Sequence, residues 1–163
     1  MLWDWRARQT KGCYLLGHGS SVDGVGFSAD GRLLASGSGD HIIRLWNVVQ
    51  RELYGRSLDG NPAGVCCVIF LGNTRLVSGS SDGSIRFWDV GTRRPISLPL
   101  VGHQAPVTSI SASSDGAWVS SGDSEGVLAL WPTEVKEWQA LARKIANRPF
   151  SEAEQIEYLH PKP

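Results

Sequence analysis

A repeat of about 43 residues is the feature that most limits how this chain can fold. Trp3, Trp46, Trp88 and Trp131 lie 43, 42 and 43 residues apart. The sequence around the last three tryptophans also recurs, as GHGSSVDGVGFSADGRLLASGSGDHIIRLWNV, GNPAGVCCVIFLGNTRLVSGSSDGSIRFWDV and GHQAPVTSISASSDGAWVSSGDSEGVLALWPT. A unit of this size cannot bury both of its faces alone, so neighbouring copies have to stack on one another. The spacing therefore predicts an array of similar units.

Each copy contains short β-rich runs separated by turn residues. In the first copy, the runs Val22–Ser28, Leu33–Ser38 and Ile42–Val48 alternate apolar or small residues with polar ones. Asp-Gly pairs at 30–31, 82–83 and 115–116 favour hairpin turns. A further apolar segment precedes each new copy, near residues 13–16, 53–58 and 96–101, and we expect it to form a fourth strand. Four antiparallel strands per copy predict a propeller blade.

The repeats resemble the WD-repeat family. A Gly-His pair near the start of a copy, as at Gly17-His18, and a Trp-Asp pair near its end, as at Trp88-Asp89, recur in that family with a similar period. The resemblance covers residues 1–133 and implies an all-β fold. This fold is a partial WD-repeat β-propeller of about three four-stranded antiparallel blades plus a half blade. The repeats span about 15–48, 57–90 and 99–133, and residues 1–14 end a preceding blade.

The resemblance also implies a buried hydrogen-bonded set in each blade, made of histidine, serine or threonine, aspartate and tryptophan. Such a set satisfies polar groups that burial would otherwise leave unpaired. The second repeat has asparagine in place of histidine, and the third has glutamate where aspartate is expected. The expected sets are His18, Ser36, Asp40 and Trp46; Asn61, Ser78, Asp82 and Trp88; and His103, Ser121, Glu125 and Trp131. We expect the second and third blades to be less firmly pinned.

A face for protein partners is a further implication of the resemblance. It is formed by the loops that enter the first strand and those between the second and third strands. The positions it marks are Ser21, Asp23, Gly39, Gly64, Cys66, Ser81, Pro106, Thr108 and Ser124. None is Trp, Tyr or Arg, the residues that most often dominate binding energy. The pattern leaves open both a peptide-binding patch and a plain solvated rim.

Two patterns invite a hydrolase interpretation. His18, Ser36 and Asp40 have the residue types of a catalytic triad, and Gly79–Gly83 matches G-x-S-x-G. The resemblance places the triad-like residues inside a blade under an indole, closed to substrate. A nucleophile elbow is followed by a helix, whereas residues 84–90 have the pattern of a strand. We expect no enzyme activity, and hydrolysis is the remote alternative.

Composition and residue spacing narrow the classes of partner and binding site that this chain can have. Sixteen basic and sixteen acidic residues give no net charge, which argues against nucleic acid or an anionic membrane as a partner. Cys13, Cys66 and Cys67 lack the spacing of a disulfide framework or zinc site, and the four histidines never lie three to five residues apart. We therefore expect no metal and no cofactor. The first residues lack the apolar core of a signal peptide, so we expect a cytoplasmic location.

Residues 134–163 depart from the repeat and predict a short C-terminal helical tail. Val135, Trp138, Leu141, Ala142 and Ile145 share one face of a helix, and residues 151–154 fit a capping box that opens a second one. The phrase ARKIANRPFSEAEQIEYL resembles the closing tail of bacterial WD-repeat proteins. Because an apolar stripe is costly to expose, docking on the propeller is favoured over a free partner-binding helix.

The strand count leaves the propeller open, since propellers have four to eight blades. The missing blades come either from a longer protein or from further copies of this chain. The leading hypothesis is a non-catalytic protein-interaction scaffold or sensor module that forms the C-terminal part of a larger bacterial WD-repeat protein. The second is a structural propeller closed by homo-oligomerisation, and the third is the hydrolase. The partner of the leading hypothesis is a protein or peptide that the sequence does not identify.

Overall fold

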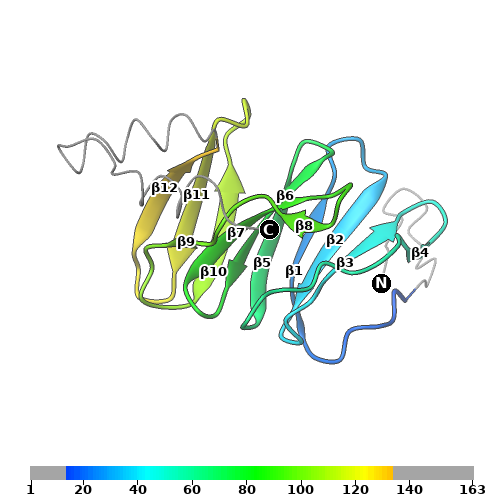
Figure 1. The fold of residues 1–163 in the computed structure, drawn as a ribbon, viewed down its shortest axis with the longest axis horizontal. Coiled ribbons are helices and arrows are strands. Elements are labelled where there is room, and N and C mark those ends of the chain that lie inside the picture. Colours follow the sequence, from blue (N-terminus) through cyan, green and yellow to red (C-terminus); the bar gives the residue numbers. More distant parts are fainter. Residues whose placement is uncertain (1–13, 134–163) are drawn as a thin grey trace, which may run out of the picture.

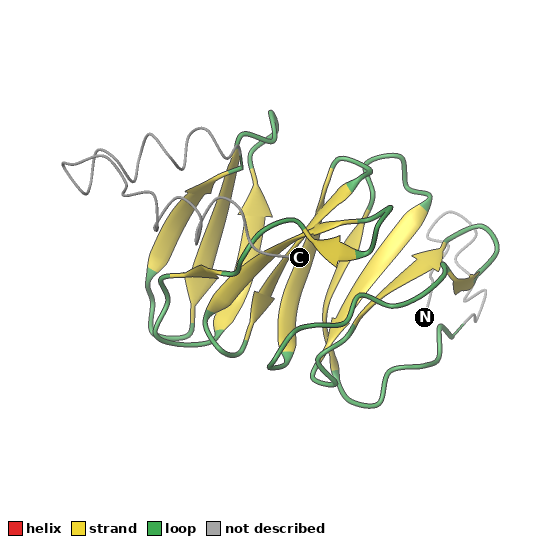
Figure 2. Ribbon diagram, viewed as in Figure 1, coloured by secondary structure: helices red, strands yellow, loops and turns green. Residues whose placement is uncertain are grey.

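A computed structural model describes residues 14–133, which form antiparallel sheets and, within that range, no helix. The sheets stand side by side like blades (Figures 1 and 2). Blade 1 has strands β1 (Val22–Phe27), β2 (Leu33–Ser38), β3 (Ile43–Asn47) and β4 (Glu52–Leu53). Blade 2 has β5 (Val65–Leu71), β6 (Arg75–Ser80), β7 (Ser84–Asp89), β8 (Arg94–Pro95) and β9 (Leu100–Val101). Blade 3 has β10 (Val107–Ala112), β11 (Trp118–Asp123) and β12 (Leu128–Pro132), so the predicted all-β partial propeller is confirmed.

The fourth strand of each complete blade is short and interrupted. In blade 1, β4 pairs with the end of β3, and a separate bridge joins Leu58 to Ile43. In blade 2, β8 and β9 pair with opposite ends of β7, and both belong to one outer strand. Tyr14–Leu16, the described part of the predicted half blade, forms no strand. The rest of that half blade and the predicted helical tail lie outside the described residues.

A bulge interrupts the first strand of every blade at the same place. The register shifts between Val22 and Gly24, between Val65 and Cys67, and between Val107 and Ser109. A bulge inserts one unpaired residue and re-aims its side chain. The inserted residues are Asp23, Cys66 and Thr108.

Glycine allows neighbouring blades to approach closely. A Cβ on Gly37 would lie 2.5 Å from a methyl carbon of Val65, and one on Gly79 would lie 2.6 Å from a methyl carbon of Val107. In each case the valine comes from the first strand of the next blade, so the same contact occurs twice. Around each contact an apolar cluster joins two blades, one including Ile43 and Val68 and the other Ile85 and Val119. The core therefore lies between the blades rather than inside any one of them.

Candidate functional site

The first predicted hydrogen-bonded set is assembled in blade 1. The Trp46 indole N–H donates to Ser36 Oγ at 2.8 Å. Ser36 therefore has its own hydroxyl proton free to donate to His18 Nε2, 2.7 Å away. With Nε2 accepting, Nδ1 carries the ring proton and donates to Asp40 Oδ2 at 3.0 Å. Arg44 Nη1 lies 2.7 Å from the same ring nitrogen and donates to Asp40 Oδ2 at 3.0 Å. The chain of donors runs in one direction, from the buried indole to the carboxylate.

The third set contains a different acid from the one expected. Trp131 donates to Ser121 Oγ at 2.7 Å, and Ser121 lies 2.6 Å from His103 Nε2. Asp123 Oδ2 accepts from His103 Nδ1 at 2.8 Å, whereas the Glu125 side chain is exposed and has no hydrogen bond to the set. This corrects the sequence-based assignment of Glu125.

The register explains how Asp123 replaces two residues of blade 1. Asp123 ends its strand opposite Val107, just as Ser38 ends its strand opposite Val22. In blade 1, Ser38 Oγ accepts from the Asp40 amide, and Asp40 then reaches the histidine. In blade 3, Asp123 Oδ1 itself accepts from the Glu125 and Val127 amides, which leaves Oδ2 for His103. The signal in the sequence is an aspartate two residues after Ser121, where the other repeats have serine.

The second set is incomplete. Trp88 donates to Ser78 Oγ at 2.9 Å, but Asn61 Nδ2 donates to the His41 carbonyl at 3.3 Å instead of joining that pair. Asn61 Oδ1 is buried and has no hydrogen-bond partner. Asp82 binds the Ser84 amide and hydroxyl rather than the residue in the histidine position. Asparagine is too short to bridge serine and aspartate as imidazole does.

Both complete sets hold their carboxylates ionised. Burial raises the pKa of Asp40, but hydrogen bonds from the Gly19 amide, His18 and Ser38 outweigh it and hold the pKa well below its usual range. Burial also raises the pKa of Asp123, and the Val127 amide and His103 more than reverse that effect. An ionised acid keeps the imidazole oriented, so these groups fix the blade.

Ser36, His18 and Asp40 are hydrogen-bonded in the same order as the residues of a catalytic triad, but a substrate cannot reach the serine. Ser36 is 5% exposed and Ser121 is 1% exposed, and an indole already bonds each hydroxyl. A nucleophile must meet its substrate, and neither serine is open to one. The G-x-S-x-G match at Gly79–Gly83 is followed by strand β7 rather than by the helix of a nucleophile elbow.

The predicted partner face resolves into one triplet per blade. In each triplet a backbone hydrogen bond joins the loop before the first strand to the loop after the second, and the third member is the bulge residue. The three bonds run from Gly39 N to Ser21 O at 3.0 Å, from Ser81 N to Gly64 O at 2.9 Å, and from Ser124 N to Pro106 O at 3.0 Å. The bulge residues that complete them are Asp23, Cys66 and Thr108.

The triplets of blades 1 and 2 adjoin. A Cβ on Gly64 would lie 3.4 Å from Gly39 Cα. Burial raises the pKa of the Cys66 thiol, and the carboxylates of Asp23 and Asp82 raise it further. The bulge side chain of one blade therefore lies within electrostatic reach of the next. A thiol held protonated in this way is a poor nucleophile, which argues for contact rather than chemistry.

No group of three or more His, Cys, Asp or Glu side chains between residues 14 and 133 could hold a metal ion. In the same part of the chain, no helix is long and apolar enough to cross a membrane.

The fold and the sets define a class of repeat protein in which neighbouring blades pack face to face and a buried hydrogen-bonded set, complete here in blades 1 and 3, holds the strands of a blade together. The family model for the WD domain, G-beta repeat, matches residues 9–47, 54–89 and 95–132, which together make up more than half of the chain. The chain belongs to the WD-repeat family. WD-repeat domains are generally non-catalytic scaffolds for contacts between proteins.

Proposed function

We propose that this chain is a non-catalytic protein-interaction scaffold or sensor module of the cytoplasm, and that it forms the C-terminal part of a larger bacterial WD-repeat protein. Its partner is a protein or peptide that docks on the triplets around Asp23, Cys66 and Thr108.

The bulges are the observation that carries this proposal. Bulges turn single side chains out of a regular sheet and are common beside functional sites. Here they occur at the same register position in every described blade, and each one adds its residue to the same loop pair. This arrangement suits a scaffold, since it presents variable side chains from a constant frame. The side chain at the bulge differs from blade to blade, since the three positions carry the carboxylate of Asp23, the thiol of Cys66 and the hydroxyl of Thr108.

A matched pair of variants tests the docking face. Thr108 is exposed, so Thr108→Arg places a bulky charge on the face without disturbing the core. Val49, 82% exposed in the turn between β3 and β4, provides the control Val49→Arg away from that face. Affinity capture from extracts of the source cells should recover partners with wild type and with Val49→Arg that are absent with Thr108→Arg. Equal recovery by all three chains would contradict the proposal.

A second candidate function, a structural propeller closed by copies of this chain, is favoured by one observation. The described blades leave an apolar face uncovered at each end of the array, with Val25 63% exposed on blade 1 and Leu128 74% exposed on blade 3. Blades of a longer protein or blades of a second copy would each cover these faces. The two candidates differ in whether the chain alone forms a closed assembly.

A further inference from the structure

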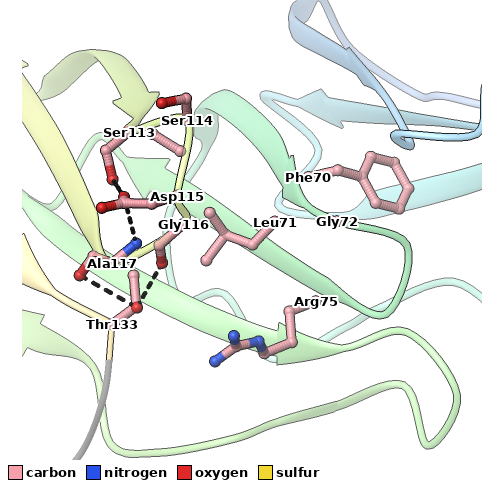
Figure 3. A pocket seen from close by; sticks show the side chains of 11 residues that line it. Phe70, Leu71, Gly72, Arg75, Ser113, Ser114, Asp115, Gly116, Ala117 and Thr133 are labelled. Carbon is pink, nitrogen blue, oxygen red and sulfur yellow. Dashed lines mark hydrogen bonds between the residues drawn. The ribbon is translucent and has the colours of Figure 1, made fainter.

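A pocket of about 470 Å³ lies between blades 2 and 3, at the ends of the strands opposite the bulges (Figure 3). The hairpin from β5 to β6 forms one side, and the hairpin from β10 to β11 forms the other. Thr133, just after β12, completes the lining. The full lining is Phe70, Leu71, Gly72, Arg75, Ala112, Ser113, Ser114, Asp115, Gly116, Ala117 and Thr133.

A short turn in blade 2 accounts for the pocket. Between register-matched pairs, the first hairpin has six residues in blade 1 (Phe27 to Leu34) and in blade 3 (Ala112 to Val119), but five in blade 2 (Phe70 to Leu76), where Leu71 and Arg75 also pair. The blade 2 hairpin is also tied to blade 1, because Gly72 O accepts from the Ala29 amide at 3.2 Å. Asn73 Oδ1 accepts from the Asp30 amide at 3.0 Å. No corresponding bond joins it to blade 3 among the described residues, and the gap stays open.

Arg75 departs from the repeat pattern at this pocket. It begins the second strand of its blade, where blade 1 has Leu33 and blade 3 has Trp118. Its guanidinium extends into the pocket rather than into the sheet (Figure 3). The residue is half-buried, and none of the ion pairs between residues 14 and 133 includes it. A cation stands where the other two blades have an apolar residue, and residues 14–133 give its charge no ion-pair partner.

Two carboxylates that the register and the pocket lining place near Arg75 accept hydrogen bonds from other groups. Asp89, opposite Arg75 in register, accepts from the amide and hydroxyl of Thr92. Asp115, on the far wall, accepts from the Ser113 hydroxyl and the Ala117 amide. Neither carboxylate lies within 4.0 Å of the guanidinium. A half-buried guanidinium attracts an anion, and a carboxylate matches its planar array of donors.

We propose that this pocket binds an acidic side chain, Glu or Asp, from a protein partner, with Arg75 as the charge-pairing residue. Leu71 and the Ala112 and Ala117 methyl groups would contact the methylene carbons of that side chain. The inference rests on the proposed function in taking the ligand to be part of a protein. It adds a second contact region at the opposite ends of the strands and states the chemistry that region recognises.

The test is a titration of the full-length ¹⁵N-labelled chain with N-acetyl-glutamate N-methylamide, followed by amide chemical shifts. We expect saturable shifts confined to residues 71–76 and 112–118. The matched neutral probe, N-acetyl-glutamine N-methylamide, should bind about tenfold more weakly, because the contact is charge-assisted. Arg75→Gln should reduce glutamate binding by a similar factor, and Arg75→Lys should retain part of it.

Arg32→Gln is the control variant, since Arg32 is an exposed arginine on the corresponding hairpin of blade 1. It should bind the glutamate probe as wild type does. Equal binding of both probes, or shifts unchanged by Arg75→Gln, would overturn the proposal. So would tighter probe binding by Glu134→Gln, because the pocket would then serve the chain's own tail. Loss of this site leaves the Thr108→Arg capture result unaffected, so the two proposals fail separately.

Discussion

At the scale of single residues, the hydrogen-bonded sets depend on the length of the side chain in the histidine position. Imidazole offers two nitrogens on opposite edges, so His18 accepts from Ser36 and donates to Asp40 at once. Asn61 occupies the same position in blade 2 and reaches neither Ser78 nor Asp82. The contribution of the position to stability should therefore differ between blades.

His18→Ala should destabilise the fold by about 1–3 kcal/mol, because it leaves the buried Ser36 hydroxyl and the Asp40 carboxylate short of a partner. Asn61→Ala should cost less, since it removes an amide whose oxygen already has no partner. Urea unfolding of both variants against wild type measures the difference. Equal losses, or a larger loss at Asn61, would show that the set in blade 1 does not pin the blade.

Asp123 and Glu125 provide a second comparison within one turn. Asp123→Ala removes the acceptor for His103 and for the Glu125 and Val127 amides, so a loss of about 1–3 kcal/mol is expected. Glu125→Ala should change stability by no more than about 0.5 kcal/mol, because the side chain is exposed. The two melting temperatures decide the assignment, and the reverse order would restore glutamate as the acid of the set.

The lowered pKa values of Asp40 and Asp123 predict how stability depends on pH. An acid whose pKa is lower in the folded chain than its ordinary 3.8 stabilises the fold above that value. The contribution disappears as the pH falls from about 4 through the folded pKa. The double variant Asp40→Asn, Asp123→Asn should have a flatter stability profile than wild type between about pH 5 and pH 2. Melting curves across this range test it, and parallel profiles would contradict the pKa assignment.

At the scale of strands and blades, the sequence predicted most of what the structure shows. Val22–Ser28, Leu33–Ser38 and Ile42–Val48 match the first three strands to within one residue, because alternation and Asp-Gly turns are local signals. The interruption of the outer strands was not predicted, and neither was the role of Asp123. Both depend on how segments distant in sequence meet, which a repeat alignment does not contain.

Gly79 tests whether close packing between blades requires glycine. Its Cβ would meet a methyl carbon of Val107 and the sulfur of Cys67, each at 2.6 Å, so Gly79→Ala should cost about 1–3 kcal/mol through overpacking. Gly122 holds the same register position in blade 3, where a Cβ would come within 3.4 Å only of the Ser109 hydroxyl oxygen, at 3.0 Å. Gly122→Ala should be milder in the chain alone, as unfolding curves of the two variants would show.

At the scale of the whole molecule, both ends of the blade array carry interface residues on which no other blade between residues 14 and 133 packs. Leu128 and Leu130 are 74% and 62% exposed, whereas their counterparts Ile85 and Phe87 in blade 2 are 0% and 7% exposed under blade 3. At the other end, Val25 is 63% exposed and its counterpart Val68 is 2% exposed. The two end faces are the two halves of the contact that joins the blades inside the chain.

The chain should therefore associate or aggregate unless further blades cover its ends, because a blade face of this kind is an apolar patch that water does not stabilise. Light scattering coupled to size-exclusion chromatography should find oligomers or aggregates of the chain alone. Leu128→Lys with Leu130→Lys should release a monomer, and Val49→Lys, on an exposed turn away from both faces, should not.

A defined closed ring of copies would favour the self-assembling propeller. Gly122→Ala should then weaken that ring, because a valine from the next copy would meet the new methyl group. Aggregation that ends when additional WD blades are joined to the chain would favour the larger protein. A wild-type monomer with a sharp melt and protected amides in β1 and β12 would refute the closure argument for both.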